Sequence, residues 1–572
     1  MFVKTNKTHI CLTIALNVRK LSSIGQSLQS LPVIKIPKYL KTSLSAVRHN
    51  EHKRADQIVK EDKQLNDSSL NDHKFDPNVC VISTTNQRLN HFLGQKYKCL
   101  DKIPLVSKEW INGNNTNGQS MRFHVHEDNP SIVVKESPQH LSATFRSLGL
   151  KSVVCDAIES MDIKSPTGIQ MAAIPSILDK KNVICSAETG SGKTMVYLAP
   201  IIQMIRQFKE YNSQQTSQYY PKGLVIVPSR ELAEQVGRVA QHLATYCGIG
   251  VAVMMGGPPQ HISHTGMDLI ISTIGLVQPL IQKRIYSIRR LNHLVIDESD
   301  TLFDDTFGGE VIDLLGSVLV RDNTHEANDE SDNEESRLES TPGGLQLVCV
   351  SATMPRNLNH TLGKIVDIDD NFDIISTHGL HHIMPHVQQN FHRIHKFERQ
   401  YKLLELVKKD VRIGKPVMVF SNRSDSSNWI YHYLNDNGVH CLRLNSEISD
   451  KERYDQLKRF QSGDCNVISC TDLGSRGLDT VGVRHVINYD CPHYVSDYIH
   501  RSGRTGRMGS KQDCLVSTFV SFKPDVMMVK KLELALRLNR PIDSVDANIK
   551  HQMNVKMKTV NNSKEMRAKR KQ

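Results

Sequence analysis

The 572-residue chain lacks any apolar run close to the roughly 18 residues that a membrane-spanning helix requires. Its twelve cysteines include no Cys-x-x-Cys pair, which argues against a zinc site and against a disulfide framework. We therefore expect no membrane span, and we expect the cysteines to be free or buried thiols in a reducing compartment.

Acidic residues are missing from residues 1–50, where eight lysines and arginines lie among Ser, Thr and apolar residues. This composition is typical of a mitochondrial transit peptide, which forms a basic amphipathic helix and is removed after import. A disordered arm that binds RNA is the alternative interpretation. The bias predicts a transit peptide ending near residue 50 and a protein of the mitochondrial matrix, with an additional nuclear pool left open.

The net charge of +12 favours a polyanionic partner such as RNA. Residues 51–139 are polar with little periodicity, so we expect a weakly ordered extension there. The run 321–344 is densely acidic and is expected to be a solvated insertion. The end of the chain, 536–572, is predicted to be a basic tail.

Apolar runs alternate with helical patterns through two long segments, which predicts βαβ units and parallel sheets covered on both faces. The first segment spans residues 140–375 and the second 388–535, so the expected fold is two tandem α/β domains. Strands are expected at 183–186, 223–228, 251–255, 268–273, 293–297 and 345–350, and at 417–420, 441–444, 465–470, 485–489 and 514–520.

The sequence Ala-Glu-Thr-Gly-Ser-Gly-Lys-Thr at 187–194 lies between an expected strand and an expected helix. Glycines there let backbone N–H groups turn toward a polyphosphate at the positive end of the helix. Lys193 would reach the β- and γ-phosphates, and the Thr194 hydroxyl would ligate Mg²⁺. The residues of this predicted ATP-binding loop are Ala187, Glu188, Thr189, Gly190, Ser191, Gly192, Lys193 and Thr194.

A second cluster follows the expected strand at 293–297, where Asp297, Glu298 and Asp300 surround Ser299. Carboxylates at the carboxyl end of a parallel strand lie on the edge where open α/β sheets bind ligands. Asp297 would hold Mg²⁺ through water, and Glu298 would polarise the attacking water.

The second segment carries arginines at fixed spacing among glycines, at 471–479 and 500–507. Such arginines can stabilise charge that develops on a γ-phosphate. A basic loop that faces RNA is the alternative.

Together these motifs, in this order, resemble those of the DEAD-box RNA helicases of helicase superfamily two, over residues 145–520. The resemblance implies two RecA-like domains and an RNA-stimulated ATPase that uses ATP and Mg²⁺. It implies catalytic roles for Lys193, Asp297, Glu298, Arg504 and Arg507, nucleotide contacts by Gln170 and Asp479, and coupling by Asp300, Ser351, Thr353 and His500. The RNA contacts that it implies are Pro228, Arg230, Gly256, Gly257, Thr273 and Thr471.

Three positions depart from the family pattern. Ser299 replaces an alanine, Leu276 replaces an arginine that grips RNA, and Ile163 replaces the aromatic residue that opens the glutamine motif. The carboxylates of Asp297, Glu298 and Asp300 are kept, so ATP hydrolysis is expected. RNA binding at Leu276 and stacking on adenine at Ile163 are expected to be weaker.

Within the family, stretches at 32–37, 227–230, 300–302 with 305–307, and 383–387 resemble those of a mitochondrial member associated with assembly of the large mitoribosomal subunit. This resemblance implies a monomer that acts on ribosomal RNA, single-stranded or in short duplexes, within large-subunit assembly particles. An ATP-gated RNA clamp, a nuclear or cytosolic role in ribosome biogenesis and a DNA helicase remain as alternatives.

Overall fold

The computed structural model describes residues 76–97, 103–112, 117–125, 143–211, 221–255, 267–282, 291–304, 307–318, 320–321, 344–354, 362, 371–472, 480, 482–507, 513–543 and 545. The predicted transit peptide, residues 322–343 of the acidic insertion, and the tail from 546 lie outside this set. Among the described helices, none is both long enough and apolar enough to cross a membrane.

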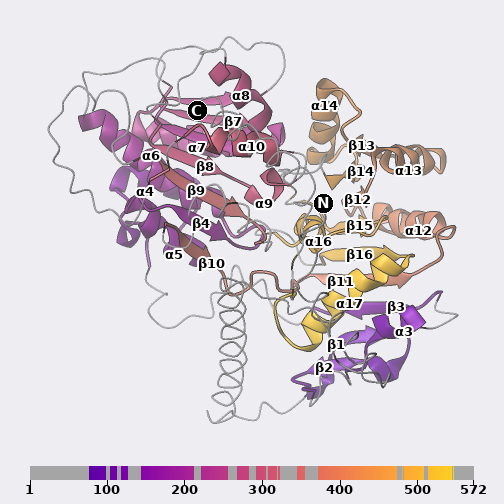
Figure 1. The fold of residues 1–572 in the computed structure, drawn as a ribbon. Helices are drawn as coiled ribbons and strands as arrows, with labels where there is room; N and C mark the ends of the chain where they lie inside the picture. The colour runs from indigo at the N-terminus through magenta and orange to yellow at the C-terminus, as the bar shows by residue number, and fades with distance from the viewer. Residues whose placement is uncertain are drawn as a thin grey trace, which may run out of the picture. The chain divides into compact units, whose positions relative to one another are not determined.

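The first of two α/β domains, domain 1, is built on a seven-stranded parallel sheet (Figure 1). The strand order is β10 (Asp373–Ser376), β4 (Val183–Ser186), β9 (Gln346–Ser351), β8 (His293–Ile296), β5 (Gly223–Val227), β7 (Leu269–Thr273) and β6 (Val251–Met254). Its helices are η3 (Arg146–Leu148), α4 (Ser152–Glu159), α5 (Gly168–Leu178), α6 (Lys193–Tyr211), α7 (Arg230–Cys247), α8 (Ile274–Gln282), α9 (Ser299–Leu302) and α10 (Gly308–Leu315).

Successive residues of a strand point to opposite faces of the sheet. Both faces of this parallel sheet are covered, so the side chains on both sides are buried. In β4, Val183 and Cys185 belong to one apolar cluster and Ile184 to the other. Strands buried on both sides read as continuous apolar runs, which is why the sequence predicted them.

The second domain, domain 2, has a nine-stranded mixed sheet. Its parallel part has the order β13 (Leu442–Leu444), β14 (Val467–Thr471), β12 (Val417–Ser421), β15 (His485–Asn488), β16 (Leu515–Val520) and β11 (Gln388–Arg393). Its helices are α12 (Arg399–Arg412), α13 (Ser424–Asp436), α14 (Asp450–Gln461), α16 (Val495–Ser502) and α17 (Lys523–Arg537). The two parallel-sheet α/β domains expected from the sequence are therefore confirmed, although β10 and β11 were not predicted.

The extension before domain 1 corrects the sequence analysis, which took residues 51–139 as weakly ordered. Its described part forms β1 (Asp76–Thr84), η1 (Gln87–Leu89), β2 (His91–Leu93), α3 (Val106–Asn112) and β3 (Ser120–Phe123). Strand β3 pairs antiparallel with β11, and β1 and β2 continue the domain 2 sheet beyond it (Figure 1). Burial explains why this segment is folded. Met121 and Phe123 are at most 1% exposed, and the Phe123 ring lies 4.9 Å from that of Phe391.

A buried ion pair on α17 fixes the extension to domain 2. Glu533 accepts hydrogen bonds from the backbone N–H groups of Val106 and Ser107, at 2.9 and 3.0 Å, at the start of α3. Arg537 donates to Glu533 and to the carbonyl of Leu89, at 3.0 and 2.6 Å. The carboxylate thus caps a helix N-terminus and the guanidinium holds the turn before β2.

The beginning of the predicted basic tail is also folded. Ile542 and Val545, only 3% and 5% exposed, join the core beneath α17, and the Ile542 N–H donates to the carbonyl of His381 at 2.9 Å. Domain 2 therefore continues past residue 535, because these apolar side chains complete its core.

Candidate functional site

The predicted phosphate loop lies between β4 and the first residue of α6, Lys193. Gly190 and Gly192 have φ values of 83° and 84°, a left-handed conformation that glycine adopts without steric cost. A Cβ atom at Gly192 would lie 2.6 Å from the Gln170 side-chain nitrogen, so any other residue there would displace the Gln170 side chain. The Lys193 ammonium donates to the carbonyls of Ala187 and Glu188, both at 2.7 Å, and burial lowers its pKa.

Gln170, predicted to contact adenine, is tied to this loop from α5. Its amide nitrogen donates to the carbonyl of Gly192 at 3.0 Å, and its amide oxygen accepts from the N–H of Thr167 at 2.9 Å. The Thr167 hydroxyl donates to the carbonyl of Ser191 at 2.9 Å. A substitution of Gln170 would therefore remove a hydrogen bond to the phosphate loop.

Asp297 directly follows β8 and accepts a hydrogen bond of 2.8 Å from the hydroxyl of Tyr197. Burial and the neighbouring charge of Glu298 raise the pKa of Asp297 to about 6. The sequence analysis missed Tyr197. Its position four residues after Lys193 places both side chains on one face of α6, which is the signal that could have revealed it.

Glu298 is held in an unusual backbone conformation, with φ 48° and ψ 48°. Left-handed backbone at a residue other than glycine is uncommon and concentrates at functional sites. Its Oε2 atom is buried and, among the residues that the structure describes, has no hydrogen-bond partner. A buried carboxylate oxygen without a donor suits a water molecule, so these residues fit the predicted water-polarising role.

Asp300 connects the two domains. Its Oδ2 atom accepts from the N–H and hydroxyl of Thr353, at 2.8 and 2.6 Å, and lies 2.9 Å from Nε2 of His500 on α16. Burial alone would raise the pKa of Asp300, but His500 and Thr353 lower it to about 2. The same contact raises the pKa of His500 against the effect of its own burial. Ser351, two residues before Thr353, pairs its hydroxyl with that of Ser186 at 2.8 Å.

The predicted arginine fingers follow α16 and face the phosphate loop and Glu298. Arg504, 3% exposed, lies 4.0 Å from Glu298 Oε1. The Cα atom of Arg507 would be 3.6 Å from a Cβ at Gly190. A side chain at Gly503 would collide with Thr189, so glycine permits this close approach.

The segment between β10 and β11 contacts loops of both domains, which the sequence analysis did not foresee. The Thr377 hydroxyl donates to Glu188 at 2.7 Å, and the Met354 N–H donates to Nε2 of His381 at 2.8 Å. Nε2 of His386 lies 2.9 Å from the carbonyl of Gly506. This linker therefore touches the phosphate loop, the segment after Thr353 and the arginine loop.

The predicted RNA contacts that the structure describes lie at the carboxyl ends of strands. Pro228 follows β5, Thr273 ends β7 and Thr471 ends β14. Arg230 begins α7, whose next residue, Glu231, forms an ion pair of 2.7 Å with Arg453 on α14. This second contact between the domains was not predicted. The remaining candidates, Gly256, Gly257 and Asp479, lie outside the described residues.

The three departures from the family pattern take apolar or buried positions. Leu276 on α8 and Ile163 after α4 pack against the two apolar clusters of domain 1. Ser299 is fully buried, and no residue in the described part of the chain bonds its hydroxyl.

Comparison with known proteins supports the same interpretation. The profile of the DEAD/DEAH box helicases matches residues 167–361, and that of the helicase conserved C-terminal domain matches residues 395–509. The chain is 32% identical to mouse "Probable ATP-dependent RNA helicase DDX28", over 94% of this chain and 96% of that protein. Human "Probable ATP-dependent RNA helicase DDX28" is 33% identical over 83% of this chain and 87% of its own length.

Solved structures show the same fold. Yeast (S. cerevisiae) Dbp5 bound to RNA and ADP BeF3 has a TM-score of 0.57 at 22% identity, covering 69% of this chain and 94% of that one. Mss116p bound to ssRNA and AMP-PNP has a TM-score of 0.58 at 21% identity, covering 72% of this chain and 79% of that one. These likenesses confirm that both domains are RecA-like.

Proposed function

The chain belongs to the DEAD-box family of ATP-dependent RNA helicases, and from this premise we propose that it remodels short RNA duplexes or RNA–protein complexes during assembly of the large mitoribosomal subunit. The observation that supports this mechanism best is the placement of Arg504 opposite Glu298 while His500 bridges to Asp300. Residues of both domains thereby meet at one site.

In the proposed mechanism, the loop N–H groups and Lys193 would hold the phosphates of ATP, while Thr194 and, through water, Asp297 would hold Mg²⁺. The bound cation supplies positive charge against the phosphate oxygens. Glu298 orients the attacking water, and Arg504 and Arg507 stabilise charge that develops on the transferred phosphoryl group.

RNA lies across the carboxyl strand ends of both domains in this proposal, held through phosphates and 2′-hydroxyls. Approach of domain 2 completes the nucleotide site, because Arg504 and His500 come from that domain. The His500–Asp300–Thr353 contacts would couple this approach to the nucleotide state. Hydrolysis would then release the RNA.

Paired substitutions test the chemistry. Glu298→Gln should lower RNA-stimulated phosphate release by about 10²- to 10⁴-fold, because the water loses its base, and should prolong the RNA-bound state. Lys193→Ala should remove turnover by weakening phosphate binding. Glu159→Gln at an exposed position of α4 is the matched control and should retain full turnover. Full turnover in Glu298→Gln would refute the assignment of the base.

The mitochondrial setting and the ribosomal role are supported by the acid-free basic composition of residues 1–50 and by the resemblance of the short stretches named above. We propose a matrix protein that acts as a monomer on ribosomal RNA. A reporter fused to residues 1–60 that stayed cytosolic would contradict import and favour the nuclear or cytosolic alternative. Crosslinking in cells, followed by sequencing of the attached RNA, tests the ribosomal substrate.

A clamp function is the second candidate, favoured by Leu276. This side chain packs into the apolar cluster of domain 1 where the family pattern has an arginine on RNA. A duplex-release assay beside an ATPase assay separates the two functions, because a clamp hydrolyses ATP without releasing the strand.

A further inference from the structure

Domain 2 exposes aromatic side chains just before α12, on α12 and on α13, and the family resemblance gives none of them a role. Phe397 and Tyr401 are 67% and 65% exposed, and Trp429 is 41% exposed. With Tyr433 they form what we call the aromatic face. The other tryptophan of the chain, Trp110, is only 2% exposed.

Two rings of the aromatic face, Trp429 and Tyr433, are held in place by other rings. Trp429 and Tyr433, one helical turn apart, are stacked at a centroid distance of 4.9 Å and an interplanar angle of 11°. Tyr489, which is 8% exposed, lies 6.0 Å from Trp429 and 6.0 Å from Phe519 in the core. A ring supported on one side and exposed on the other can stack a further flat group at little entropic cost.

Cations lie among these rings. Lys396 lies over the Phe397 ring, 4.7 Å from its centroid, and the Arg399 guanidinium lies 4.7 Å from the centroid of Tyr489. Helix α12 carries five Lys and Arg residues against two acidic ones, a net charge of +3. Lys409 and Arg412 are exposed in its last turn. This charge is complementary to a phosphate backbone.

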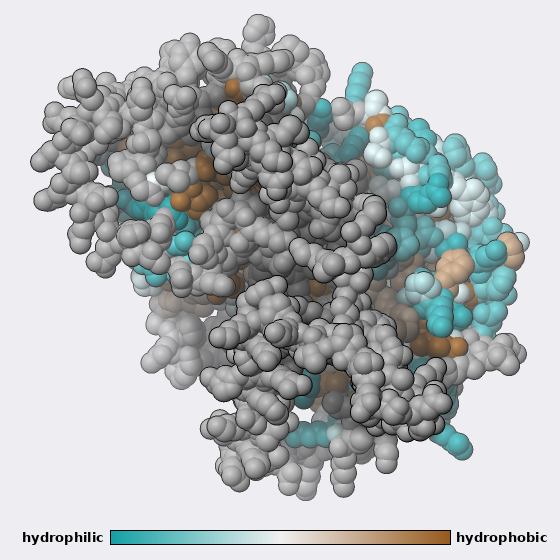
Figure 2. Space-filling view, viewed as in Figure 1, coloured by the Kyte–Doolittle hydropathy of each residue, from teal (hydrophilic) through white to brown (hydrophobic). Residues whose placement is uncertain are grey.

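The surroundings favour nucleic acid over a protein partner. Figure 2 shows that the described surface on the side of α12, α13 and α14 is mostly hydrophilic, with only isolated hydrophobic residues. Protein interfaces centre on a closely packed apolar patch, whereas single-stranded nucleic acid is bound by aromatic side chains interspersed with cations. The aromatic face has the second composition.

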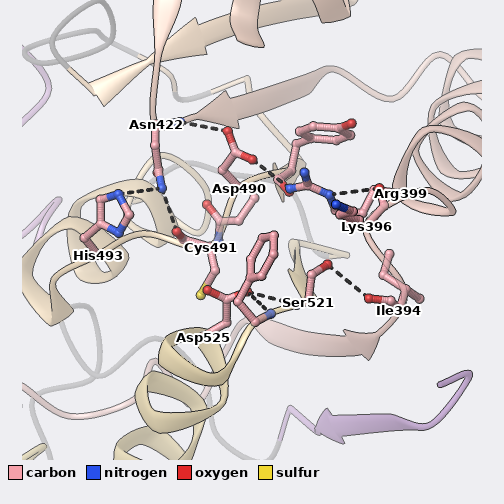
Figure 3. Close-up of polar contacts among 12 residues, drawn as sticks. Ile394, Lys396, Arg399, Asn422, Asp490, Cys491, His493, Ser521 and Asp525 are labelled. Atoms are coloured by element: carbon pink, nitrogen blue, oxygen red, sulfur yellow. Dashed lines mark hydrogen bonds and ion pairs between the residues drawn. The ribbon is translucent and has the colours of Figure 1, made fainter. Parts of the chain in front are cut away.

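Hydrogen bonds connect this face to the predicted RNA path. Arg399 donates to Asp490 at 2.7 Å, and Asp490 accepts from the backbone N–H of Asn422 at 3.2 Å (Figure 3). Arg501 then donates to Asn422 at 2.6 Å and to Asp472 at 2.6 Å. Asp472 directly follows Thr471, so the aromatic face and the predicted RNA contact share one rigid network at the carboxyl edge of the sheet.

We propose that the aromatic face is a second binding site for single-stranded RNA, in which bases stack on Trp429 and Tyr401 and phosphates lie along the basic side of α12. The proposal uses the RNA-binding activity of the family, but it adds a surface outside the motifs on which that activity depends. Longer single strands would bind both surfaces, and short ones only the predicted path across the two domains.

The test compares the full chain with oligouridylates of about 8 and about 25 nucleotides, lengths that span one or both surfaces. Trp429→Ala should weaken the Kd for the longer RNA by about 5- to 100-fold, since one stacked base is lost, and leave the Kd for the shorter RNA unchanged. Trp429→Phe should restore most of the affinity. Replacing Lys409 and Arg412 by Ala should make binding of the longer RNA less steeply dependent on salt.

Ile413→Ser is the matched control, because Ile413 is 65% exposed at the end of α12 but lies outside the aromatic face. It should leave both RNA affinities unchanged. In a Trp110→Phe background, the fluorescence of Trp429 should be quenched by the longer RNA and not by the shorter one. Equal Kd values for the longer RNA in Trp429→Ala and the unsubstituted protein would refute the proposal. Loss of affinity for the longer RNA in Ile413→Ser alone would also refute it, because the RNA would then contact the end of α12 and not the aromatic face.

Discussion

The buried charges around Arg501 in domain 2 and around Glu298 in domain 1 are paired in opposite ways. In domain 2, Arg501 is 1% exposed and donates to both carboxylate oxygens of Asp472, at 2.6 and 2.7 Å, and to Asn422. In domain 1, Asp297 and Glu298 lie side by side, the pKa of Asp297 is raised to about 6 by burial and the Glu298 charge, and the Oε2 atom of Glu298 has no partner within the described residues. Removing one partner of a buried charge pair destabilises a fold, whereas a buried charge with a shifted pKa and an open oxygen is available for chemistry.

The sharpest test of this contrast uses two arginines three residues apart. Arg504→Ala should lower RNA-stimulated ATP hydrolysis by about 10³-fold or more, as expected for an arginine finger, because positive charge next to the transferred phosphoryl group is lost. Single-turnover phosphate release measures this effect. Thermal unfolding of the variant reports any accompanying loss of stability, since Arg504 is 3% exposed. Full turnover together with a large loss of stability would place Arg504 with the structural charges instead.

Arg501→Met should act mainly on stability. It leaves Asp472 without its bidentate partner, and we expect the free energy of unfolding to fall by about 3 kcal/mol, a somewhat smaller loss than for a fully buried pair because Asp472 is 27% exposed. Urea unfolding followed by circular dichroism measures it. Arg423→Met is the matched control: Arg423 is 75% exposed, and its ion pair with Asp425 should contribute no more than about 1 kcal/mol.

The His500–Asp300 contact predicts a pH dependence. Because the pKa of His500 is raised above 6.5 when it meets Asp300, the contact is fully formed below pH 6.5 and weakens as the pH rises through the raised value. Affinity for RNA in the presence of a non-hydrolysable ATP analogue should therefore decrease toward alkaline pH. His500→Gln should flatten this dependence, and an unchanged slope in that variant would assign the pH effect to another group.

Two buried hydroxyls in domain 1 extend the comparison to smaller effects. Tyr197→Phe removes the hydrogen bond to Asp297 and should destabilise the protein by about 1.5–3 kcal/mol, the usual range for a bond to a charged group. It should also raise the Mg²⁺ concentration needed for nucleotide binding, because Asp297 loses its orientation. Calorimetric titration of Mg²⁺ with ADP measures this directly, and an unchanged Mg²⁺ requirement would limit Tyr197 to packing.

Ser299→Ala should have the smallest effect, and of the opposite sign. Its hydroxyl is buried without a partner among the described residues, so its removal should raise the free energy of unfolding by up to about 1 kcal/mol. Thermal unfolding measures the change. A loss of stability would mean that the hydroxyl makes a bond that the described contacts lack.

Local sequence patterns predicted most of the two sheets. Strands such as β4 and β12 are buried on both faces, so they can be recognised from their continuous apolar sequence alone. Strand β11, with the sequence Gln-Gln-Asn-Phe-His-Arg, carries mostly polar residues and gave no such signal. Its partner β3 lies in a polar segment far away in the chain, so neither strand could be recognised without the other.

The position of the phosphate loop was predictable, because its glycines and Lys193 are spaced for a turn from a strand into a helix. Tyr197 and Thr377 were not, because a tyrosine in an apolar helix pattern and a threonine in a linker have many ordinary uses. Their importance depends on what lies across from them, Asp297 and Glu188, and only the tertiary structure shows that. The roles of all the predicted site residues, Gly256, Gly257 and Asp479 among them, stay predictions.

The pairing of β3 with β11 has a consequence for how the protein is made. Arg122 bonds Asn390, 268 positions later, so the early strands leave the ribosome long before the strand that they join exists. Domain 1 can complete its core in that interval. The early strands of the domain 2 sheet keep an unpaired edge until β11 is synthesised, and unpaired strand edges are prone to aggregation. A shortened version starting just before the glutamine motif would expose the edge of β11 permanently, so attempts to produce the catalytic part by itself should include the residues from β1 onward.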